Sequence, residues 1–181
     1  MGGVGAGTQD FVVGNHVLEH VQDVFGALKT VARVLKPNGV VFLALPEKRW
    51  TFDVHRATTS VQHHLRDHVE GPEWSRRAHY EDVLRHVVGY DQDDVADMAD
   101  KMMRNHTDIH FHVWDFPAMM QLFAAVEQDT SIDLEIETAV LSPIEVVWVL
   151  VKRDGARQGK SHAAESLAAS RKRQRELLRD L

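Results

Sequence analysis

The chain has 181 residues and a formal net charge of −6, which suits one domain with a sizeable core and argues against a general nucleic-acid binder. It contains no cysteine, which excludes disulfides and thiolate metal sites and favours a cytoplasmic location. Its longest apolar run, in "GVVFLALP", is too short to cross a bilayer, so no membrane partner is expected.

The first part of the chain predicts a strand, a helix and a second strand. "DFVVG" (10–14) is a short apolar run typical of a buried parallel strand. "KPNG" (36–39) contains helix breakers, and "VVFLALP" (40–46) predicts the second strand. Between them, apolar residues at helical spacing predict an amphipathic helix over 17–35: Val17, Val21, Val24, Leu28, Val31 and Leu35. Together these elements predict one βαβ unit.

The middle of the chain, about 47–108, is polar, rich in histidine and mostly helical by pattern. Three helices are predicted, in "TTSVQHHLRDHV", "AHYEDVLRHVVG" and "DQDDVADMADKMMRNH". A stretch of this length is too long for a simple loop, so we interpret it as a helical insert.

The closing part predicts a helix and two strands. "DFPAMMQLFAAVEQ" reads as a helix with Asp115 as its cap and Pro117 in its first turn. "SIDLEIETAVL" alternates polar and apolar residues, and "IEVVWVLVKR" is more continuously apolar, so the pair predicts an antiparallel hairpin. We therefore expect a domain over 1–152 and a charged helical tail over 153–181.

Two short motifs near the N-terminus suggest binding sites. The glycines of residues 2–7 resemble a phosphate-binding loop, but they precede a strand instead of joining a strand to a helix. His16, Glu19 and His20 fit the H-x-x-E-H spacing of a zinc peptidase helix. That motif fixes only three positions in a chain with twelve histidines, and it lacks its third metal ligand.

A family resemblance accounts for the stretch that contains these two motifs. "DFVVGNHVLEHV" resembles the fourth strand and following turn of the class I S-adenosylmethionine-dependent methyltransferases of the type 11 group. "ALKTVARVLKPNGVVFLALP" resembles the helix, the R-x-L-K-P-x-G turn and the fifth strand. "IDLEIETAVLSPIEVVWVLVKR" stands where that fold has its last two strands, and "EKRWTFDVHRATTSVQHHLRDH" resembles the stretch after the fifth strand in a bacterial subgroup. The resemblance implies an α/β fold with a partial Rossmann-like methyltransferase sheet, whose strands are equivalent to strands 4, 5, 6 and 7.

The resemblance also implies a cofactor and site residues. S-adenosylmethionine would be the cofactor, with Asn15 and His16 lining its pocket, and the methyl acceptor would be a small molecule or a glycan-like compound. Glu19 and His20 would face the methyl-transfer site as catalytic residues, although a surface acid and a helix-packing histidine are the alternatives. Substrate-facing roles fall on four polar residues of the insert: Asp53, Arg56, His64 and Asp67. No metal ligand is assigned.

The family's first three strands, its glycine-rich cofactor motif and its ribose-binding acid do not precede the fourth-strand equivalent here. We therefore expect a partial domain, active or inactive as the chain stands, with an exposed strand edge that favours a homo-oligomer. Two alternatives stay open: a non-catalytic binding or assembly remnant of this fold, and a metal-dependent hydrolase built on histidines and carboxylates.

The insert itself offers metal-type side chains. If 58–69 is helical, His64 and His68 lie four residues apart, with Asp67 beside them. His79, His110 or His112 would complete a shell, and the alternative is a polar helix face. In "HFHVWD", an extended chain would place His110 and His112 on one face.

Overall fold

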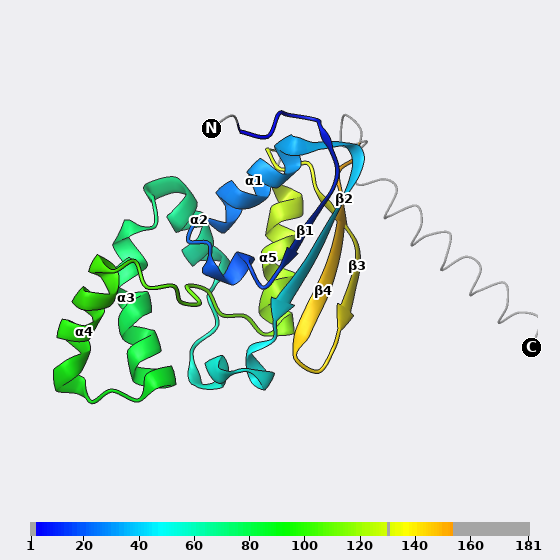
Figure 1. Cartoon of the computed structure of the whole chain (residues 1–181). Helices are drawn as coiled ribbons and strands as arrows, with labels where there is room; N and C mark the ends of the chain where they lie inside the picture. The colour runs from blue at the N-terminus through cyan, green and yellow to red at the C-terminus, as the bar shows by residue number, and fades with distance from the viewer. Residues whose placement is uncertain (1–2, 130, 154–181) are drawn as a thin grey trace, which may run out of the picture.

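The structure is a computed structural model that describes residues 3–129 and 131–153. Its centre is a four-stranded sheet of order β1-β2-β4-β3 (Figure 1). β1 and β2 are parallel, and the pairs β2/β4 and β3/β4 are antiparallel. The strands are β1 (Gln9–Asn15), β2 (Leu35–Pro46), β3 (Glu135–Leu141) and β4 (Glu145–Val151). The predicted α/β class and the closing hairpin are confirmed.

Helices cover one face of the sheet. In β2, Val41 and Leu43 are buried, whereas Phe42 between them is 36% exposed, because successive strand side chains point to opposite faces. The buried face packs against α1 (Val24–Val34) and α5 (Phe116–Gln128), as Figure 1 shows. No helix of the described residues covers the other face, where Phe11 is 67% exposed. Apolar side chains on that face remain in contact with solvent.

β1 is an edge strand. Among the described strands it pairs only with β2, from Gln9 to Asn15. Val13, like Phe11, is exposed at 55%. The predicted exposed strand edge is therefore present in this part of the chain.

The first helix is shorter than the sequence predicts. Residues Leu18–His20 form a single 3-10 turn (η1), and the chain is extended at Val21 before α1 begins at Val24. Asp23 caps α1 by accepting a hydrogen bond from the Gly26 N–H at 2.8 Å, which fixes the helix start there. α1 ends at Val34, and 36–39 belongs to the start of β2. The predicted helix over 17–35 is wrong at its N-terminal end, and His16 and His20 share no helix.

The insert is helical, as predicted, and forms its own small core. Two 3-10 turns, η2 (Lys48–Trp50) and η3 (Phe52–His55), precede α2 (Val61–Glu70), α3 (Glu73–Val83), the π-helical segment η4 (Leu84–Val88) and α4 (Gln92–Arg104). α3 and α4 lie on the far side of α2 from the sheet (Figure 1). Their buried side chains pack with those of the segment that follows α4: Tyr80, Val83, Leu84, Val95, Ala99, Ile109 and Phe111.

α5 begins where its cap predicts. The Asp115 carboxylate accepts a hydrogen bond from the Ala118 N–H at 2.9 Å, and Pro117 lies in the first turn. β3 begins later than expected, because Ile132 and Leu134 are buried in the core before the strand starts. The predicted tail lies almost wholly outside the described residues. None of the helices within 3–129 and 131–153 is long and apolar enough to span a bilayer.

Candidate functional site

Most of the predicted site residues gather at the carboxyl ends of β1 and β2. β1 ends at Asn15, which is exposed, and His16 follows in the left-handed region with φ of 51°. The His16 N–H donates to the Ala44 carbonyl at 2.9 Å, which holds the turn against β2. Ligands of open α/β sheets bind at this edge, because the loops that follow the parallel strands converge there.

Glu19 is the most unusual residue of this edge. Its side chain is 0% exposed, and neither carboxylate oxygen makes a hydrogen bond with a described residue. His16 Nδ1 lies 3.5 Å from Glu19 Oε1, and His20 Nε2 lies 4.0 Å from it. The interpretation of Glu19 as a surface acid is therefore wrong. Buried carboxylates without partners are costly, so such a group is a candidate for function.

An outer carboxylate holds each histidine beside Glu19. His16 Nε2 lies 2.8 Å from Glu145 Oε2 on β4, and His20 Nδ1 lies 2.9 Å from Asp108 Oδ1. The two imidazoles are 45% and 31% exposed, so they connect the buried Glu19 with solvent. The chain places two carboxylate–histidine pairs around one buried acid.

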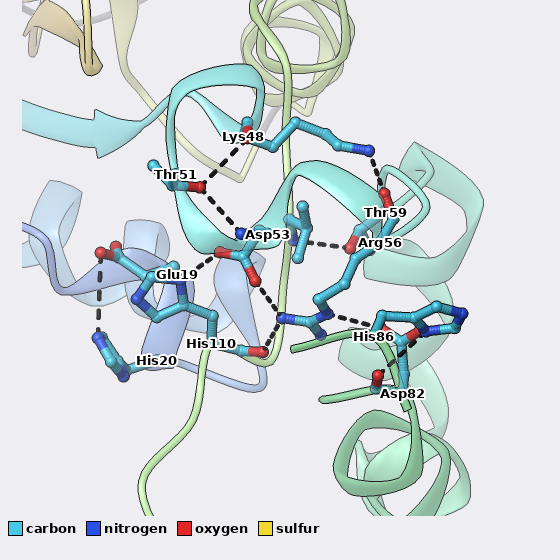
Figure 2. A network of polar contacts seen from close by, with 11 residues as sticks. Glu19, His20, Lys48, Thr51, Asp53, Arg56, Thr59, Asp82, His86 and His110 are labelled. Atoms are coloured by element: carbon cyan, nitrogen blue, oxygen red, sulfur yellow. Dashed lines mark hydrogen bonds and ion pairs between the residues drawn. The ribbon is translucent and has the colours of Figure 1, made fainter. Parts of the chain in front are cut away.

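A second network lies next to this one, in the turns after β2 (Figure 2). Arg56 Nη1 donates to Asp53 Oδ1 at 2.8 Å and to the His110 carbonyl at 2.9 Å, and its Nε donates to Asp82 Oδ2 at 2.6 Å. His110 Nδ1 lies 2.6 Å from Asp53 Oδ2. Burial alone would raise the pKa of Asp53, but the hydrogen bonds from His110 and Arg56 lower it below its usual value.

The predicted substrate residues are thus all buried. Asp53 and Arg56 are each 2% exposed and pair with one another, three residues apart, as a D-x-x-R pattern on a helical turn allows. His64 Nε2 accepts a hydrogen bond from Trp114 Nε1 at 3.0 Å, and Asp67 Oδ1 accepts one from Ser75 Oγ at 3.1 Å. Their roles toward substrate stay predictions.

Metal-type side chains form two groups. Glu19, His20 and His110 make one, and His63, Asp67, His79 and His112 make the other, with one ligand atom of each residue within 4.8 Å of the rest of its group. The sequence suggested Asp67 with His79 or His112 and Glu19 with His20, but not the exact sets, because their members come from segments far apart in the chain.

His64 and His68 lie one turn apart on α2, as predicted, but they contact different partners. His68 Nδ1 contacts Asp23 Oδ1 at 3.0 Å, whereas His64 bonds to Trp114. His110 and His112 belong to different groups, so the expectation that they share one face does not lead to one site.

The N-terminal glycines lie away from this edge. The Gly7 and Thr8 N–H groups donate to the carbonyls of Arg33 and Val34 at the end of α1, beside the start of β1. A cofactor loop would have to lie at the opposite end of the strand, beyond Asn15.

Comparison with known proteins places this geometry in a family. Residues 3–126 match the family model described as a methyltransferase domain. A search of curated proteins found no match. Among solved structures, a Listeria monocytogenes protein assigned to the S-adenosylmethionine-dependent methyltransferases is 8% identical with a TM-score of 0.41, over 84% of this chain and 65% of that protein. The [4+2]-cyclase SpnF is 12% identical with a TM-score of 0.32, over 83% of this chain and 53% of that protein.

The chain therefore spans less than two thirds of the length of either structure. The family match confirms the predicted resemblance and, with the observed strand pairing, the partial Rossmann-like sheet. Because that match covers more than half of the 181 residues, the chain belongs to the methyltransferase domain family.

Proposed function

We propose that this chain serves S-adenosylmethionine-dependent methyl transfer to a small-molecule or glycan-like acceptor, with Glu19 as the group that receives the acceptor's proton. The observation that carries the proposal is the buried Glu19 carboxylate, which makes no hydrogen bond with a described residue and lies just past the carboxyl end of β1. Proton transfer in such a reaction needs a base held close to the reacting atom.

The residues at this edge suit a positively charged cofactor. A buried carboxylate without a hydrogen bond favours a cation nearby, and the cofactor, when bound, would supply an electrophilic methyl group on a cationic sulfur. Asn15 offers an exposed amide at the strand end, and His16 lies beside both Asn15 and Glu19. These two residues are our choice for the cofactor side of the site.

The proton path follows from the contacts around Glu19. In methyl transfer from the bound cofactor, Glu19 would receive the proton that the acceptor loses. His20 lies beside Glu19 and is itself bonded to Asp108, so it can return the proton to solvent. His16 and Glu145 form the equivalent pair on the other side. The site therefore has a base and two exits for its proton.

The test is release of S-adenosylhomocysteine, measured with a panel of hydroxyl, amine and carboxyl acceptors. Glu19→Gln keeps the shape but not the base, so we expect turnover to fall by roughly 10²–10⁴-fold with cofactor binding within tenfold of wild type. Glu73→Gln, an exposed acid on α3, is the matched control. Equal turnover in Glu19→Gln and wild type would remove Glu19 from the reaction. Cofactor binding without turnover on any acceptor would favour the non-catalytic remnant.

A second candidate function is a metal-dependent hydrolase, because Glu19, His20 and His110 form a group of metal-type residues. His20 and His110 each use Nδ1 on a carboxylate, of Asp108 and Asp53, as metal-bound histidines commonly do. Three protein ligands would leave a position open for water. Metal in untagged protein that disappears in His20→Ala would favour this candidate, and metal-free protein with methyl transfer would eliminate it.

The composition and the sheet edge bear on the location, substrate class and oligomeric state that we propose. The absence of cysteine supports a cytoplasmic location, and the charge of −6 supports a small-molecule substrate over nucleic acid. The unpaired edge of β1 supports a homo-oligomer.

A further inference from the structure

The histidine-rich insert holds a second group of polar side chains, which the proposed methyl transfer does not use. His63 and Asp67 lie one turn apart on α2, His79 comes from α3, and His112 comes from the segment before α5. His63 Nε2 lies 3.1 Å from Asp67 Oδ2 and 3.1 Å from His79 Nε2. Three segments of the chain thus bring four ligand-type residues to one point.

Two members of this group are buried with an unused polar atom. Asp67 and His112 are each 1% exposed. Asp67 Oδ2 and His112 Nδ1 make no hydrogen bond with a described residue, although His63 lies close to Asp67. Burial of such atoms costs about 1–3 kcal/mol each in mutational data, so a native structure keeps them for a reason.

The other atoms of these two side chains have partners. Asp67 Oδ1 accepts from Ser75 Oγ, and His112 Nε2 donates to the Gln22 carbonyl at 3.0 Å. Metal-bound imidazoles typically donate their second N–H to a carbonyl or carboxylate, which orients the ring. Both side chains therefore have a partner outside the group, and His112 Nε2 also lies 3.8 Å from Asp67 Oδ2.

The group has too few N–H donors for the number of lone pairs that it brings together. A neutral imidazole carries one N–H, so His63 Nε2 can serve only one of its two close neighbours, Asp67 Oδ2 or His79 Nε2. With neutral rings, two lone pairs therefore face each other in at least one of these two contacts. A positive ion at the centre would turn every one of these lone pairs into a favourable contact.

We propose that His63, Asp67, His79 and His112 form a divalent cation site, of the imidazole-and-carboxylate chemistry that suits zinc. Imidazole and carboxylate ligands in a four-membered set match zinc and similar borderline ions. Zn–N bonds of about 2.0–2.1 Å imply ligand separations of about 3.3–3.4 Å in a tetrahedron, close to the two 3.1 Å contacts. The widest separation, within 4.8 Å, requires the side chains to close on the ion.

The site would have a structural role. Four protein ligands leave no open position, which is typical of structural zinc. The ion would join α2, α3 and the segment before α5, and so fasten the insert to the part of the chain that leads into the core. Loss of the ion should then loosen the insert.

Zinc content and thermal stability of untagged, full-length protein test this proposal. We expect about one zinc per chain, a rise in Tm of several degrees on zinc addition, and reversal by a chelator. His79→Ala and Asp67→Asn should each weaken zinc affinity by more than the roughly 10–100-fold that loss of an outer partner causes. Asp67→Asn keeps the side-chain volume, so it separates ligand loss from misfolding.

Two further variants locate the ion. His20→Ala removes a member of the group around Glu19 and should keep the zinc, and His86→Ala, an exposed histidine beside Asp82, should do the same. Zinc lost in His20→Ala but kept in His79→Ala would overturn the proposal in favour of the other group. Folded wild type with well under one zinc per chain, and no change of Tm on zinc addition, would overturn it outright.

Discussion

At the scale of single residues, Glu19 carries a cost that folding does not offset. Its carboxylate is out of water and makes no hydrogen bond with a described residue, and only the long contacts of His16 and His20 reach it. A buried acid without hydrogen bonds opposes folding, and groups of this kind persist where function requires them.

This cost makes a prediction that does not depend on finding the acceptor. Glu19→Gln removes the buried charge while it preserves the shape, so we expect the free energy of unfolding to rise by about 1 kcal/mol or more. Urea unfolding followed by circular dichroism measures the change, with exposed Glu73→Gln as the matched control. A clear loss of stability in Glu19→Gln would show that the carboxylate has a stabilising partner after all.

Arg56 is the opposite case, because its charge is fully compensated. It donates to Asp53, Asp82 and the His110 carbonyl, and it is 2% exposed. Arg56→Met leaves Asp53 buried without its main cation, so we expect a loss of about 3–5 kcal/mol in the free energy of unfolding.

The matched control is Arg66→Met, which removes an exposed ion pair with Glu70 and should change stability by less than about 1 kcal/mol. Comparable losses in the two variants, measured by the same urea titration, would mean that the Arg56 network does not fasten the turns after β2.

At the scale of elements, Glu47 joins the end of β2 to the start of α5. Its side chain is buried and accepts from the Phe116 N–H at 2.7 Å and from Arg49 Nη2 at 2.8 Å. Burial opposes the charged form, but the hydrogen bonds from Arg49 and Phe116 hold the pKa of Glu47 below its usual value.

The stability that Glu47 provides should therefore depend on pH. A carboxylate with a lowered folded pKa stabilises above its unfolded pKa, about 4.3, and this contribution is lost as the pH falls through the folded value. Glu47→Gln should lower the unfolding free energy by about 1–3 kcal/mol at pH 7 and by less at pH 3. Urea titrations at both values measure this, and an equal loss at pH 3 and pH 7 would contradict the account.

Local signals in the sequence predicted some elements well and missed others. Asp115 and Pro117 specify the start of α5 on their own, and the alternation in β3 and β4 specifies the hairpin. The apolar spacing over 17–35 continues through Val21, but the cap at Asp23 is a competing local signal that sets the real helix start. Apolar spacing shows which residues could lie in an amphipathic helix, and the capping residue determines where the helix begins.

The site was harder to predict because its contacts are not local. The family resemblance predicts a role for Glu19, and the structure shows it buried between two histidines. The sequence offers His79, His110 and His112 as alternatives beside the histidines of α2, and only the fold of the insert shows that His79 and His112 join His63 and Asp67. The burial of Asp53 and Arg56 could not be predicted from the sequence either.

At the scale of the whole molecule, the sheet exposes apolar side chains on the face that no described helix covers. β1 is unpaired on one side within the described residues, and Phe11 and Val13 project from it at 67% and 55% exposure. Exposed apolar edge strands promote pairing with a second copy. We expect sedimentation velocity to show dimers or larger species at micromolar concentration.

A charge on the edge should oppose this association. Val13→Lys should shift the protein toward monomer, because a lysine on β1 disfavours pairing through that edge, whereas Val140→Lys on β3, at the opposite edge, leaves the β1 edge unchanged and should not. A monodisperse wild-type monomer at all concentrations would contradict this expectation.

We propose that this partial methyltransferase sheet binds its cofactor at the carboxyl ends of β1 and β2. Calorimetric titration of the folded, untagged chain with S-adenosylmethionine measures that binding. We expect a saturable, one-site binding heat. Absence of saturable heat from protein that circular dichroism shows to be folded would contradict it.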